Sequence, residues 1–515
     1  MSVADYDVAI VGCGPVGATA ANLFGQAGLR TLVIERETAP YPLPRAVHID
    51  HEMMRYFQAV DLARDILPLM REAQGHIHIG ADGGVIRYLG SKGLAKRFGW
   101  ANDYFFFQPE LEAALRAGAQ RFPNVSLLRA SVNGITQDSD GVTLTCGGET
   151  ARARYVVACD GASSFVRKQL GIALRDLNFE QPWLVVDAEL GGPIHFPPFT
   201  GVPAEAELEN LSVMLCDPNR PSTLVPGRGR HRRWEFMLLP GESDEAMMQP
   251  GRVKELLAPF VGGEPHQLLR AATYRFHGLI AERWQDRRVF LAGDAAHQTP
   301  PFFGQGMCHG IRDVANLAWK LAFVLKRDGD PDLLATYQIE REPQVRAVVD
   351  AAIAAGRYIC ERDPQAARKR DETLRAAMGK PAPKSASDLI PPLAAGVIES
   401  TTPGAGARFI QPMVVSDGRR MLLDDATGGG FVLLGPPGFA AALAPSAAAA
   451  WQALGGKSFD IGSAAMDDVE GALIGWLKQH DAAAVILRPD FYVYGTAYDA
   501  ASAARVIARL SAMVT

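Results

Sequence analysis

The stretch VAIVGCGPVGATAANLFGQAGLRTLVIER, residues 8–36, limits the fold of this chain more than any other segment. Gly12, Gly14 and Gly17 follow an apolar run in a G-x-G-x-x-G spacing, and Glu35 closes a second apolar run. This spacing predicts a strand, a tight turn, a helix and a parallel strand that bind a dinucleotide, with the acid on the ribose. A glycine-rich turn in an unrelated α/β protein is the alternative, and the distal acid argues against it. The predicted cofactor contacts in this unit are Gly12, Gly14, Pro15, Gly17, Glu35 and Arg36.

Length and composition set wider limits. A chain of 515 residues exceeds the size of one usual core, so we expect two or three domains. The net charge of −5 gives no reason to expect nucleic acid or an anionic membrane as a partner. No run is apolar for long enough to cross a bilayer, and the N-terminus lacks a secretory pattern, which favours a cytoplasmic protein. The six cysteines show no metal-ligand spacing, so we expect reduced thiols and no metal site.

Changes in pattern along the chain predict the domains. Residues 1–175 alternate strand and helix and form the first part of a nucleotide-binding domain, with strands near 76–105 contributed to a second sheet. Residues 176–280 are β-rich with aromatic residues, which favours a sheet that forms the wall of a pocket. Residues 281–378 return to the nucleotide-binding domain and its helices. A segment rich in Pro, Ala and Gly, 379–400, is the predicted linker, and 401–515 form a compact α/β domain.

Two later segments resemble nucleotide-binding turns when they are taken together with the first. In CDGASSFVRKQLG, residues 159–171, a buried strand ends at a D-G pair and a helix follows. In LAGDAAHQTPPFFGQGMCHGIRDVANLAWKL, residues 291–321, a G-D pair follows a strand and a Gly-Gln-Gly turn opens a long helix. Either one alone is explained by an ordinary turn between a strand and a helix.

These three segments resemble the fingerprints of the single-component flavin-dependent aromatic hydroxylases, the family of p-hydroxybenzoate hydroxylase and phenol hydroxylase. The stretches PRAVHIDHEMMR, FFFQPELEAAL, RRWEFMLLPGES and RVFLAGDAAHQTPPFFGQGM look most similar to the 3-(3-hydroxyphenyl)propionate hydroxylases. The similarity runs in order through most of the first 350 residues and more weakly to the C-terminus.

The resemblance implies an α/β fold with a Rossmann-like FAD-binding domain of the p-hydroxybenzoate hydroxylase type and an interleaved β-sheet substrate domain. The last domain resembles a thioredoxin-like domain, here without cysteines, which excludes dithiol chemistry in it. FAD is expected to stay bound, whereas NADH or NADPH docks transiently and NADH is preferred. The implied reaction is hydroxylation by O2, through a flavin hydroperoxide, of a phenolic substrate such as a 3-(3-hydroxyphenyl)propionate-like acid.

The resemblance also assigns residues to the cofactor. Asp294 matches an aspartate that binds the ribityl chain, and its alternative role is a helix N-cap. Arg45 matches an arginine on a mobile loop, and Gln108 matches a glutamine near the pyrophosphate or ribityl region. The long helix that starts near Gly306 points its positive end at the flavin. The remaining predicted contacts are Asp160, Gly161, Arg167, Gly293, Gly304 and Gln305.

The residues that act on the substrate are harder to assign. His48 is a candidate base for the phenolic proton, because a neutral imidazole can accept a proton near pH 7. Pro300 stiffens the approach to the reactive side of the flavin. Arg232 and Trp234 are candidate substrate contacts on the sheet wall, and a strand with solvated arginines explains them as easily.

Several alternatives stay open at this level. The same fold serves hydroxylases of polyketides and of resorcinol-type phenols, and less closely flavin halogenases and reductases. A non-catalytic FAD-binding protein is a further alternative. The sequence does not fix the aromatic substrate, the ring position or the choice of monomer or homodimer.

Overall fold

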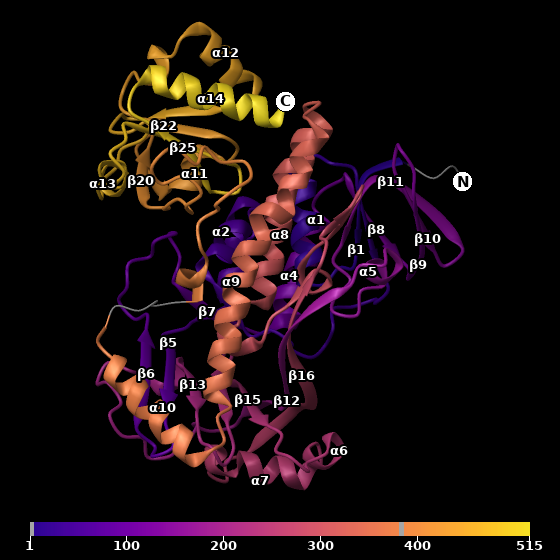
Figure 1. Ribbon diagram of the computed structural model, residues 1–515, viewed down its shortest axis with the longest axis vertical. Helices are drawn as coiled ribbons and strands as arrows, with labels where there is room; N and C mark the ends of the chain where they lie inside the picture. Colours follow the sequence, from indigo (N-terminus) through magenta and orange to yellow (C-terminus); the bar gives the residue numbers. More distant parts are fainter. Residues whose placement is uncertain (1–4, 381–385) are drawn as a thin grey trace.

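The computed structural model describes residues 5–380 and 386–515, and it is built around two large sheets joined by long helices (Figure 1). Residues 381–385 of the predicted linker lie outside the described residues. The first sheet has the strand order β17-β18-β11-β1-β2-β8, and β10 and β9 extend it from β11. Its central strands, β18, β11, β1, β2 and β8, are parallel. Its strands are β1 (Asp5–Val11), β2 (Thr31–Glu35), β8 (Val125–Arg129), β9 (Val132–Gln137), β10 (Val142–Cys146), β11 (Glu149–Ala158), β17 (Gln285–Asp286) and β18 (Val289–Leu291).

The first β-α-β unit forms as the glycine spacing predicts. Helix α1 (Pro15–Gln26) connects β1 to β2, which pair in parallel. The small residues of α1 let this helix pack closely against α4 (Gln108–Ala119) and α8 (Gly306–Lys326). Gly28 follows α1 at a φ of +71°, a conformation that glycine adopts without strain.

The second sheet faces the carboxyl ends of the first sheet's strands (Figure 1). Its order is β19-β16-β12-β15-β14-β13-β5-β6. One face packs on an apolar cluster that includes Trp234 and residues of α7 (Pro250–Val261), and the other face lines a cavity. The strands are β5 (Gly75–Ile79), β6 (Val85–Gly90), β12 (Leu174–Leu190), β13 (Ser212–Leu215), β14 (Ser222–Pro226), β15 (His231–Met237), β16 (His266–Ala281) and β19 (His297–Gln298).

A small sheet of order β3-β7-β4 and several helices join these layers. Helices α8 and α9 (Thr336–Ile359) run side by side through the middle of the molecule, and α10 (Pro364–Ala377) packs on β6. The other elements of this part are β3 (His48–Asp50), β4 (Met70–Glu72), β7 (Asp103–Phe106), α2 (His51–Ala59), α3 (Ala63–Ile66), α5 (Phe165–Gln169) and α6 (Asp244–Met247). Within the described ranges, no helix combines the length and apolarity that a membrane span requires.

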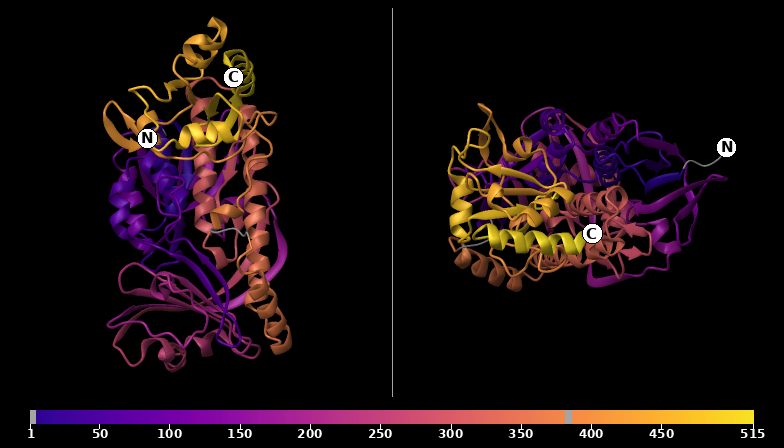
Figure 2. Two further views of the ribbon diagram at one scale, coloured as in Figure 1. Left: turned by 90° about the vertical axis from the view of Figure 1, so that its left-hand side faces the viewer. Right: turned by 90° about the horizontal axis from the view of Figure 1, so that it is seen from above.

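The C-terminal residues form a separate layered unit at one end of α8 and α9 (Figures 1 and 2). A four-stranded sheet has the order β23-β22-β24-β25, in which β22 and β23 are parallel and the other pairs are antiparallel. Helix α13 packs on one face of this sheet, and α12 and α14 pack on the other. The elements are β20 (Met413–Ser416), β21 (Arg419–Leu422), β22 (Val432–Gly435), β23 (Lys457–Asp460), β24 (Ala484–Leu487), β25 (Val493–Ala497), α11 (Leu423–Thr427), α12 (Pro445–Ala453), α13 (Ala472–Gln479) and α14 (Ala500–Val514).

Buried ion pairs connect this C-terminal unit to the start of α8. Arg408 Nη1 lies 3.1 Å from Glu52 Oε2, and the same oxygen accepts a hydrogen bond from Arg312 Nε at 2.7 Å. Arg312 also donates to Asp50 Oδ2 at 2.5 Å and to Gln305 Oε1 at 3.1 Å. Burial alone would raise the pKa of the Glu52 carboxyl, but the charges of Arg312 and Arg408 outweigh it and hold that pKa well below its usual range.

Replacement of Arg312 by methionine should destabilise the protein strongly. The substitution leaves the carboxylates of Asp50 and Glu52 buried with less compensation, which costs about 3–5 kcal/mol of the free energy of unfolding. Urea denaturation measures this loss. Arg346→Met is the matched control, because Arg346 is 47% exposed and pairs with Asp350 on the surface of α9, so about 1 kcal/mol or less is expected. Equal losses in the two variants would contradict the importance of the buried network.

Candidate active site

A cavity of about 500 Å³ lies where the carboxyl ends of the first sheet and the start of α8 meet the polar face of the second sheet. This volume is within the range of small-molecule sites. The predicted site residues that line it are Gly14, Pro15, Arg45, His48, Gln108, Gly161, Asp294, Gly304 and Gly306. All three glycine-containing segments therefore reach one cavity, although they are far apart in the sequence.

The first turn has the close packing that its glycines predict. Gly12 has a φ of +95°, and a Cβ there would lie 2.6 Å from the carbonyl oxygen of Cys159. A Cβ on Gly17 would lie 2.0 Å from the oxygen of Gly12, so helix α1 touches the turn directly. A Cβ on Gly14 would meet nothing within 4 Å. Gly14 is the N-cap of α1, so open space lies in front of this helix N-terminus, as binding of a pyrophosphate requires.

Glu35 and Arg36 lie at the end of β2 beside this turn. Glu35 accepts a hydrogen bond from the backbone N–H of Cys13 at 2.6 Å through Oε2. The Arg36 side chain is 74% exposed, and its Nε lies 3.3 Å from Glu37 Oε1. Glu35 is thus held at the edge of the turn, the place that a ribose-binding acid occupies, whereas Arg36 points to solvent.

In the second segment, the side chains hold the turn and the backbone faces the cavity. Gly161 has a φ of +82° and lines the cavity. Asp160 accepts a hydrogen bond from the N–H of Val166 at 3.1 Å. Arg167 is buried and donates to the carbonyl oxygens of Ala295 at 3.0 Å and Ala162 at 2.9 Å. Arg167 therefore fastens the second segment to the third, and it does not line the cavity where a phosphate would lie.

The third segment is held by a buried carboxylate. The N–H of Gly293 donates to Asp313 Oδ2 at 3.0 Å, and His297 Nε2 lies 2.7 Å from the same oxygen. Asp294 is open to the cavity yet has protein on its other sides, and this burial raises the pKa of its carboxyl. Gly306, the first residue of α8, lines the cavity, so the positive end of the helix lies at the cavity.

Two predicted residues of this segment do not line the cavity. Pro300 is buried, and its neighbours Thr299 and Pro301 line the cavity in its place. The side chain of Gln305 is buried and accepts a hydrogen bond from Arg312, so it belongs to the ion-pair network below the helix N-terminus. The stiffening of the loop and the support of the helix are roles that these positions can still fill.

Arg45 and Gln108 act on the same loop. Gln108 Oε1 accepts hydrogen bonds from the N–H groups of Arg45 at 2.9 Å and Ala46 at 2.7 Å. Arg233 on β15 donates to the carbonyl oxygens of Arg45 at 2.5 Å and Pro44 at 2.6 Å. The loop is therefore fixed from both sides, with the exposed side chain of Arg45 at the cavity.

His48 lies in the cavity wall with both ring nitrogens near acceptors. Nε2 lies 2.9 Å from Asp103 Oδ1, and Nδ1 lies 3.5 Å from the carbonyl oxygen of Gly304. Burial alone would lower the pKa of His48, but the hydrogen bond and charge of Asp103 outweigh it and raise that pKa above its usual value. A protonated imidazole that donates to both neighbours is consistent with this geometry, which makes His48 a poor proton acceptor.

Arg232 and Trp234, predicted as substrate contacts, do not line the cavity. Trp234 is fully buried in the apolar cluster behind the sheet, and Arg232 donates to the backbone carbonyls of Gly229 and His231. Successive strand residues point to opposite faces, so their neighbours Arg233 and Glu235 face the cavity instead. This correction shifts the predicted contacts by one residue along β15.

Sequence reasoning missed the other polar residues of this wall. They include His76, Ser212, Thr223, Glu235 and Arg270, each from a different strand. The period-two alternation of RRWEFM could have identified Glu235, since it places Arg233 and Glu235 together opposite the large apolar residues. The other residues come from distant segments, and the sequence carries no local signal that brings them together.

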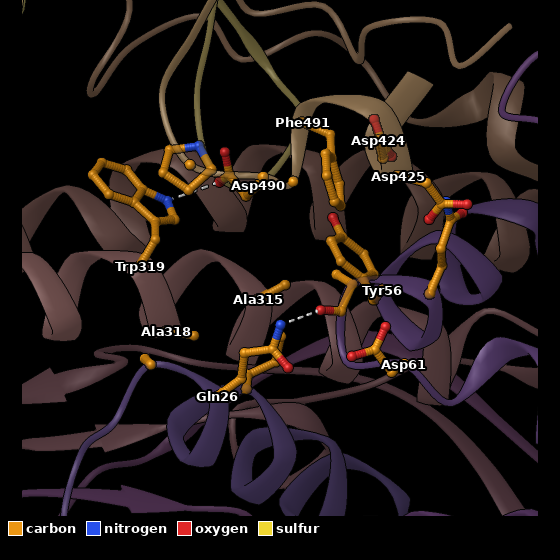
Figure 3. A pocket seen from close by; sticks show the side chains of 18 of the residues that line it. Gln26, Tyr56, Asp61, Ala315, Ala318, Trp319, Asp424, Asp425, Asp490 and Phe491 are labelled. Carbon is orange, nitrogen blue, oxygen red and sulfur yellow. Dashed lines mark hydrogen bonds between the residues drawn. The ribbon is translucent and has the colours of Figure 1, made fainter. Parts of the chain in front are cut away.

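A second and larger cavity, of about 1230 Å³, lies between the C-terminal unit and helices α1, α2 and α8 (Figure 3). Trp319 donates to Asp490 there at 3.1 Å, and Gln26 donates to the carbonyl oxygen of Ala59 at 2.8 Å. None of the three glycine-containing turns reaches it. We place the active site in the smaller cavity because residues of all three glycine-containing turns line it and none of them lines the larger one.

The smaller cavity fits a flavin nucleotide. Open space lies in front of Gly14 and Gly306, where no atom comes within 4 Å of the position that a Cβ would take. The buried hydroxyl of Thr299, which lines the cavity, has no hydrogen-bond partner among the described residues. A parallel sheet, two helix N-termini and an acid at the end of β2 define a dinucleotide-binding α/β protein. The described residues contain no cluster with metal-ligand geometry.

Comparisons with known proteins identify the family. Residues 5–352 match the FAD binding domain family, and residues 406–513 match the HcaD C-terminal domain. A probable NADH-specific resorcinol 4-hydroxylase of Rhodococcus jostii is 36% identical over 99% of this chain and 95% of its own length. A 3-(3-hydroxy-phenyl)propionate/3-hydroxycinnamic acid hydroxylase of Burkholderia vietnamiensis is also 36% identical, over 94% of this chain and 92% of its own length.

Solved structures agree on the fold. Aklavinone-11 hydroxylase, in a complex with FAD and aklavinone, matches with a TM-score of 0.79 and 24% identity over 100% of this chain and 99% of that chain. The flavin-dependent monooxygenase PieE matches with a TM-score of 0.81 and 22% identity over 99% of both chains. The chain belongs to the single-component FAD-dependent aromatic hydroxylases, and it is a flavoprotein monooxygenase that binds FAD.

Alanine substitutions at Gly14 and Gly17 should separate cofactor binding from folding. Gly14→Ala adds a methyl group to open space, so the apoprotein should keep its melting temperature while FAD affinity falls at least about tenfold, or ~1.4 kcal/mol. Gly17→Ala places a Cβ against the oxygen of Gly12, so the apoprotein itself should melt earlier. FAD fluorescence titration and thermal unfolding of the two apoproteins measure these effects. Unchanged FAD affinity in Gly14→Ala would contradict the placement of the pyrophosphate.

Proposed function

We propose that this enzyme hydroxylates a small uncharged phenol of the resorcinol class, with NADH as the electron donor. The observation that supports this substrate class is the character of the buried cavity wall. Arg233, which could pair with a substrate carboxylate, spends its donors on Asp187 and on the carbonyl oxygens of Pro44 and Arg45. Arg270 also donates to Pro44, and its Nε lies 3.7 Å from Asp187.

The remaining buried polar groups of the wall suit hydroxyl groups better than a carboxylate. Burial lowers the pKa of His76 to about 4, so its imidazole is neutral. Thr223 contributes a hydroxyl, and Glu235 contributes a carboxyl that would repel an anion. The apolar part of the lining contains Phe276 and Phe302, whose ring centroids are 6.4 Å apart with the planes close to perpendicular. Such an arrangement suits an aromatic ring with polar substituents.

In the proposed reaction, the residues of this chain bind, orient and protect the reactants. The backbone at Gly14 and Gly306 and the side chain of Asp294 would hold FAD, and Arg45 lies on a loop at the same cavity. Bound FAD, once reduced by NADH, supplies the activation of O2 and the transfer of one oxygen atom. The positive end of α8, at Gly306, would stabilise negative charge on a reduced cofactor bound in the cavity. Enclosure by the second sheet keeps bulk water from the reaction.

A hydroxyphenylpropionate-like acid is the second candidate substrate, and Arg45 is the observation that favours it. Its guanidinium is exposed, lines the cavity and has no ion pair among the described residues. A propionate side chain that reaches this guanidinium would be neutralised there. The name of the Burkholderia relative agrees with such a substrate, whereas the name of the Rhodococcus relative agrees with resorcinol and with NADH.

We also propose that the C-terminal unit is thioredoxin-like. Its mixed four-stranded sheet, with the order β23-β22-β24-β25 and helices on both faces, supports this assignment. No cysteine follows Cys360, so the unit is proposed to be structural.

A substrate panel tests the proposed function. Resorcinol should increase the rate of NADH oxidation and give a product that is one oxygen atom heavier by mass spectrometry. Its kcat/KM should exceed that of 3-(3-hydroxyphenyl)propionate by at least about tenfold, or ~1.4 kcal/mol. NADPH in place of NADH is the control for the electron donor. The proposal fails if no phenol in the panel accelerates NADH oxidation or is oxygenated, and the second candidate replaces it if the acid is preferred.

A further inference from the structure

The carboxyl group of Glu235 is buried in the cavity wall without a partner. Glu235 lies in the middle of β15 and is 8% exposed. It lines the cavity, yet it forms no hydrogen bond or ion pair with any residue that the structure describes. A buried polar group that makes no hydrogen bond costs about 1–3 kcal/mol, so such a group is expected to meet a ligand. The backbone of Glu235 pairs with β12 and β14, but its carboxyl makes no bond that holds the sheet together.

Polar groups on neighbouring strands share this property. Thr223 on β14 lies directly across from Glu235 in the strand register, and its Oγ1 has no partner among the described residues. His76 on β5 lines the same cavity and its Nδ1 is likewise unpaired within the described part of the chain. Side chains directly opposite on paired strands have Cβ atoms about 4.5–5.5 Å apart. The side chains of Glu235 and Thr223 are therefore spaced to bind two substituents of one aromatic ring.

The charged residues around Glu235 leave its carboxyl available to bind a ligand. Arg233, Asp187 and Arg270 are the charged residues that act on it, and they lie on its own strand and on β12 and β16. Asp187 takes both the Nε and an Nη donor of Arg233, at 2.9 Å and 3.1 Å, so this guanidinium is already paired. Burial raises the pKa of Glu235 to about 7, although the charge of Arg233 opposes the rise. The carboxyl can therefore exist in either protonation state near neutral pH.

We propose that Glu235 is a catalytic residue that accepts the proton of the substrate's phenolic hydroxyl, and that Thr223 binds a second polar substituent of the ring. The O–H bond of the phenol breaks, its electron pair stays on the phenolate oxygen, and the proton forms a bond to a Glu235 carboxyl oxygen. The phenolate pushes electron density into the ring and so prepares it for attack by an electrophilic oxygen. This inference rests on the proposed function, since it requires a phenolic substrate in the cavity.

Glu235 suits this role better than His48, the base predicted from the sequence. His48 Nε2 is engaged by Asp103, and its Nδ1 lies near the carbonyl oxygen of Gly304, so neither ring nitrogen is free to accept a proton from a substrate. The carboxyl of Glu235 is free on the cavity side. Above about pH 7 this carboxyl is mostly ionised, and the carboxylate can accept a proton.

Glu235→Gln tests the proposal, with Glu189→Gln as the matched control because Glu189 lies exposed on β12 of the same sheet. Glu235→Gln should lower kcat/KM for the phenol about a hundredfold to ten-thousandfold. The wild type should lose kcat/KM as pH falls below about 7, because Glu235 becomes protonated, and the variant should lack this limb of the pH profile. Glu189→Gln should behave as the wild type in both respects. Equal kcat/KM and an equal pH profile in Glu235→Gln and the wild type would overturn the proposal.

A binding measurement separates this inference from the proposed function. Resorcinol is titrated into the oxidised holoenzyme without NADH, and binding is followed by the change in flavin absorbance. The wild-type Kd should rise about tenfold as pH falls through 7, because a charge-assisted hydrogen bond is lost, and it should stay constant in Glu235→Gln. A wild type that binds resorcinol in this way but oxygenates no phenol would contradict the proposed function alone. The same Kd and pH dependence in both proteins would overturn the role of Glu235.

A second variant keeps the test decisive if Glu235→Gln does not retain FAD. Thr223→Val removes the unpaired hydroxyl and keeps the shape of the side chain. It should raise the KM for resorcinol about tenfold with a smaller effect on kcat, because it removes a binding contact and leaves the proton acceptor. An unchanged KM in Thr223→Val would contradict the recognition of the ring by this part of the sheet.

Discussion

The carboxylate of Asp313 is the group on which the rest of the active site depends. It lies fully buried on α8, where it accepts hydrogen bonds from Gly293 and Arg341 and faces His297. Burial would raise its pKa, but the charges of His297 and Arg341 outweigh the effect and lower it, so the group stays ionised. An ionised group in this place fixes the G-D turn to the helix whose N-terminus lies at the cavity.

This contact also sets the distance between the first and third segments. A Cβ on Gly310 of α8 would lie 2.6 Å from Val16 of α1 and 2.9 Å from the Cα of Gly293. Only a glycine at 310 lets the two helices and the turn meet so closely. The backbone groups that line the cavity at these turns are thus positioned by packing and by one buried acid, and not by side chains that reach into the cavity. Arg167 adds to this by joining the second segment to Ala295.

The C-terminal unit supports the same helices from the other end. Arg488 pairs with Glu340 on α9 at 2.7 Å, and Lys320 on α8 pairs with the same carboxylate at 2.9 Å. These groups are fully buried, and buried pairs stabilise a fold mainly when every member is satisfied. Through these pairs the unit contacts both α8 and α9, and α8 begins at the cavity.

Much of this architecture could be predicted because glycines and strand ends are local signals. The turn at Gly12 and the family's fold follow from spacing and resemblance, and the cavity contains nine of the predicted site residues. The prediction that Arg232 and Trp234 line the cavity is wrong. Alternate residues of β15 point to opposite faces of the sheet, and which set faces the cavity depends on which face packs on α7. The side chains of Gln305 and Arg167 bind Arg312 and Ala295, which come from elsewhere in the fold, and the contacts predicted between these two residues and the cofactor stay predictions. Tertiary contacts of this kind have no signature in a single sequence.

Titration of deflavinated Asp313→Asn protein with FAD tests the central claim most directly. An asparagine cannot carry the charge that pairs with Arg341 and His297, so the third segment should lose its fixed position. We expect FAD affinity at least about tenfold weaker than that of the wild type, while the apoprotein still unfolds cooperatively. Asp350→Asn, which changes an exposed acid on α9, should bind FAD as the wild type does. Wild-type affinity in Asp313→Asn would contradict the account.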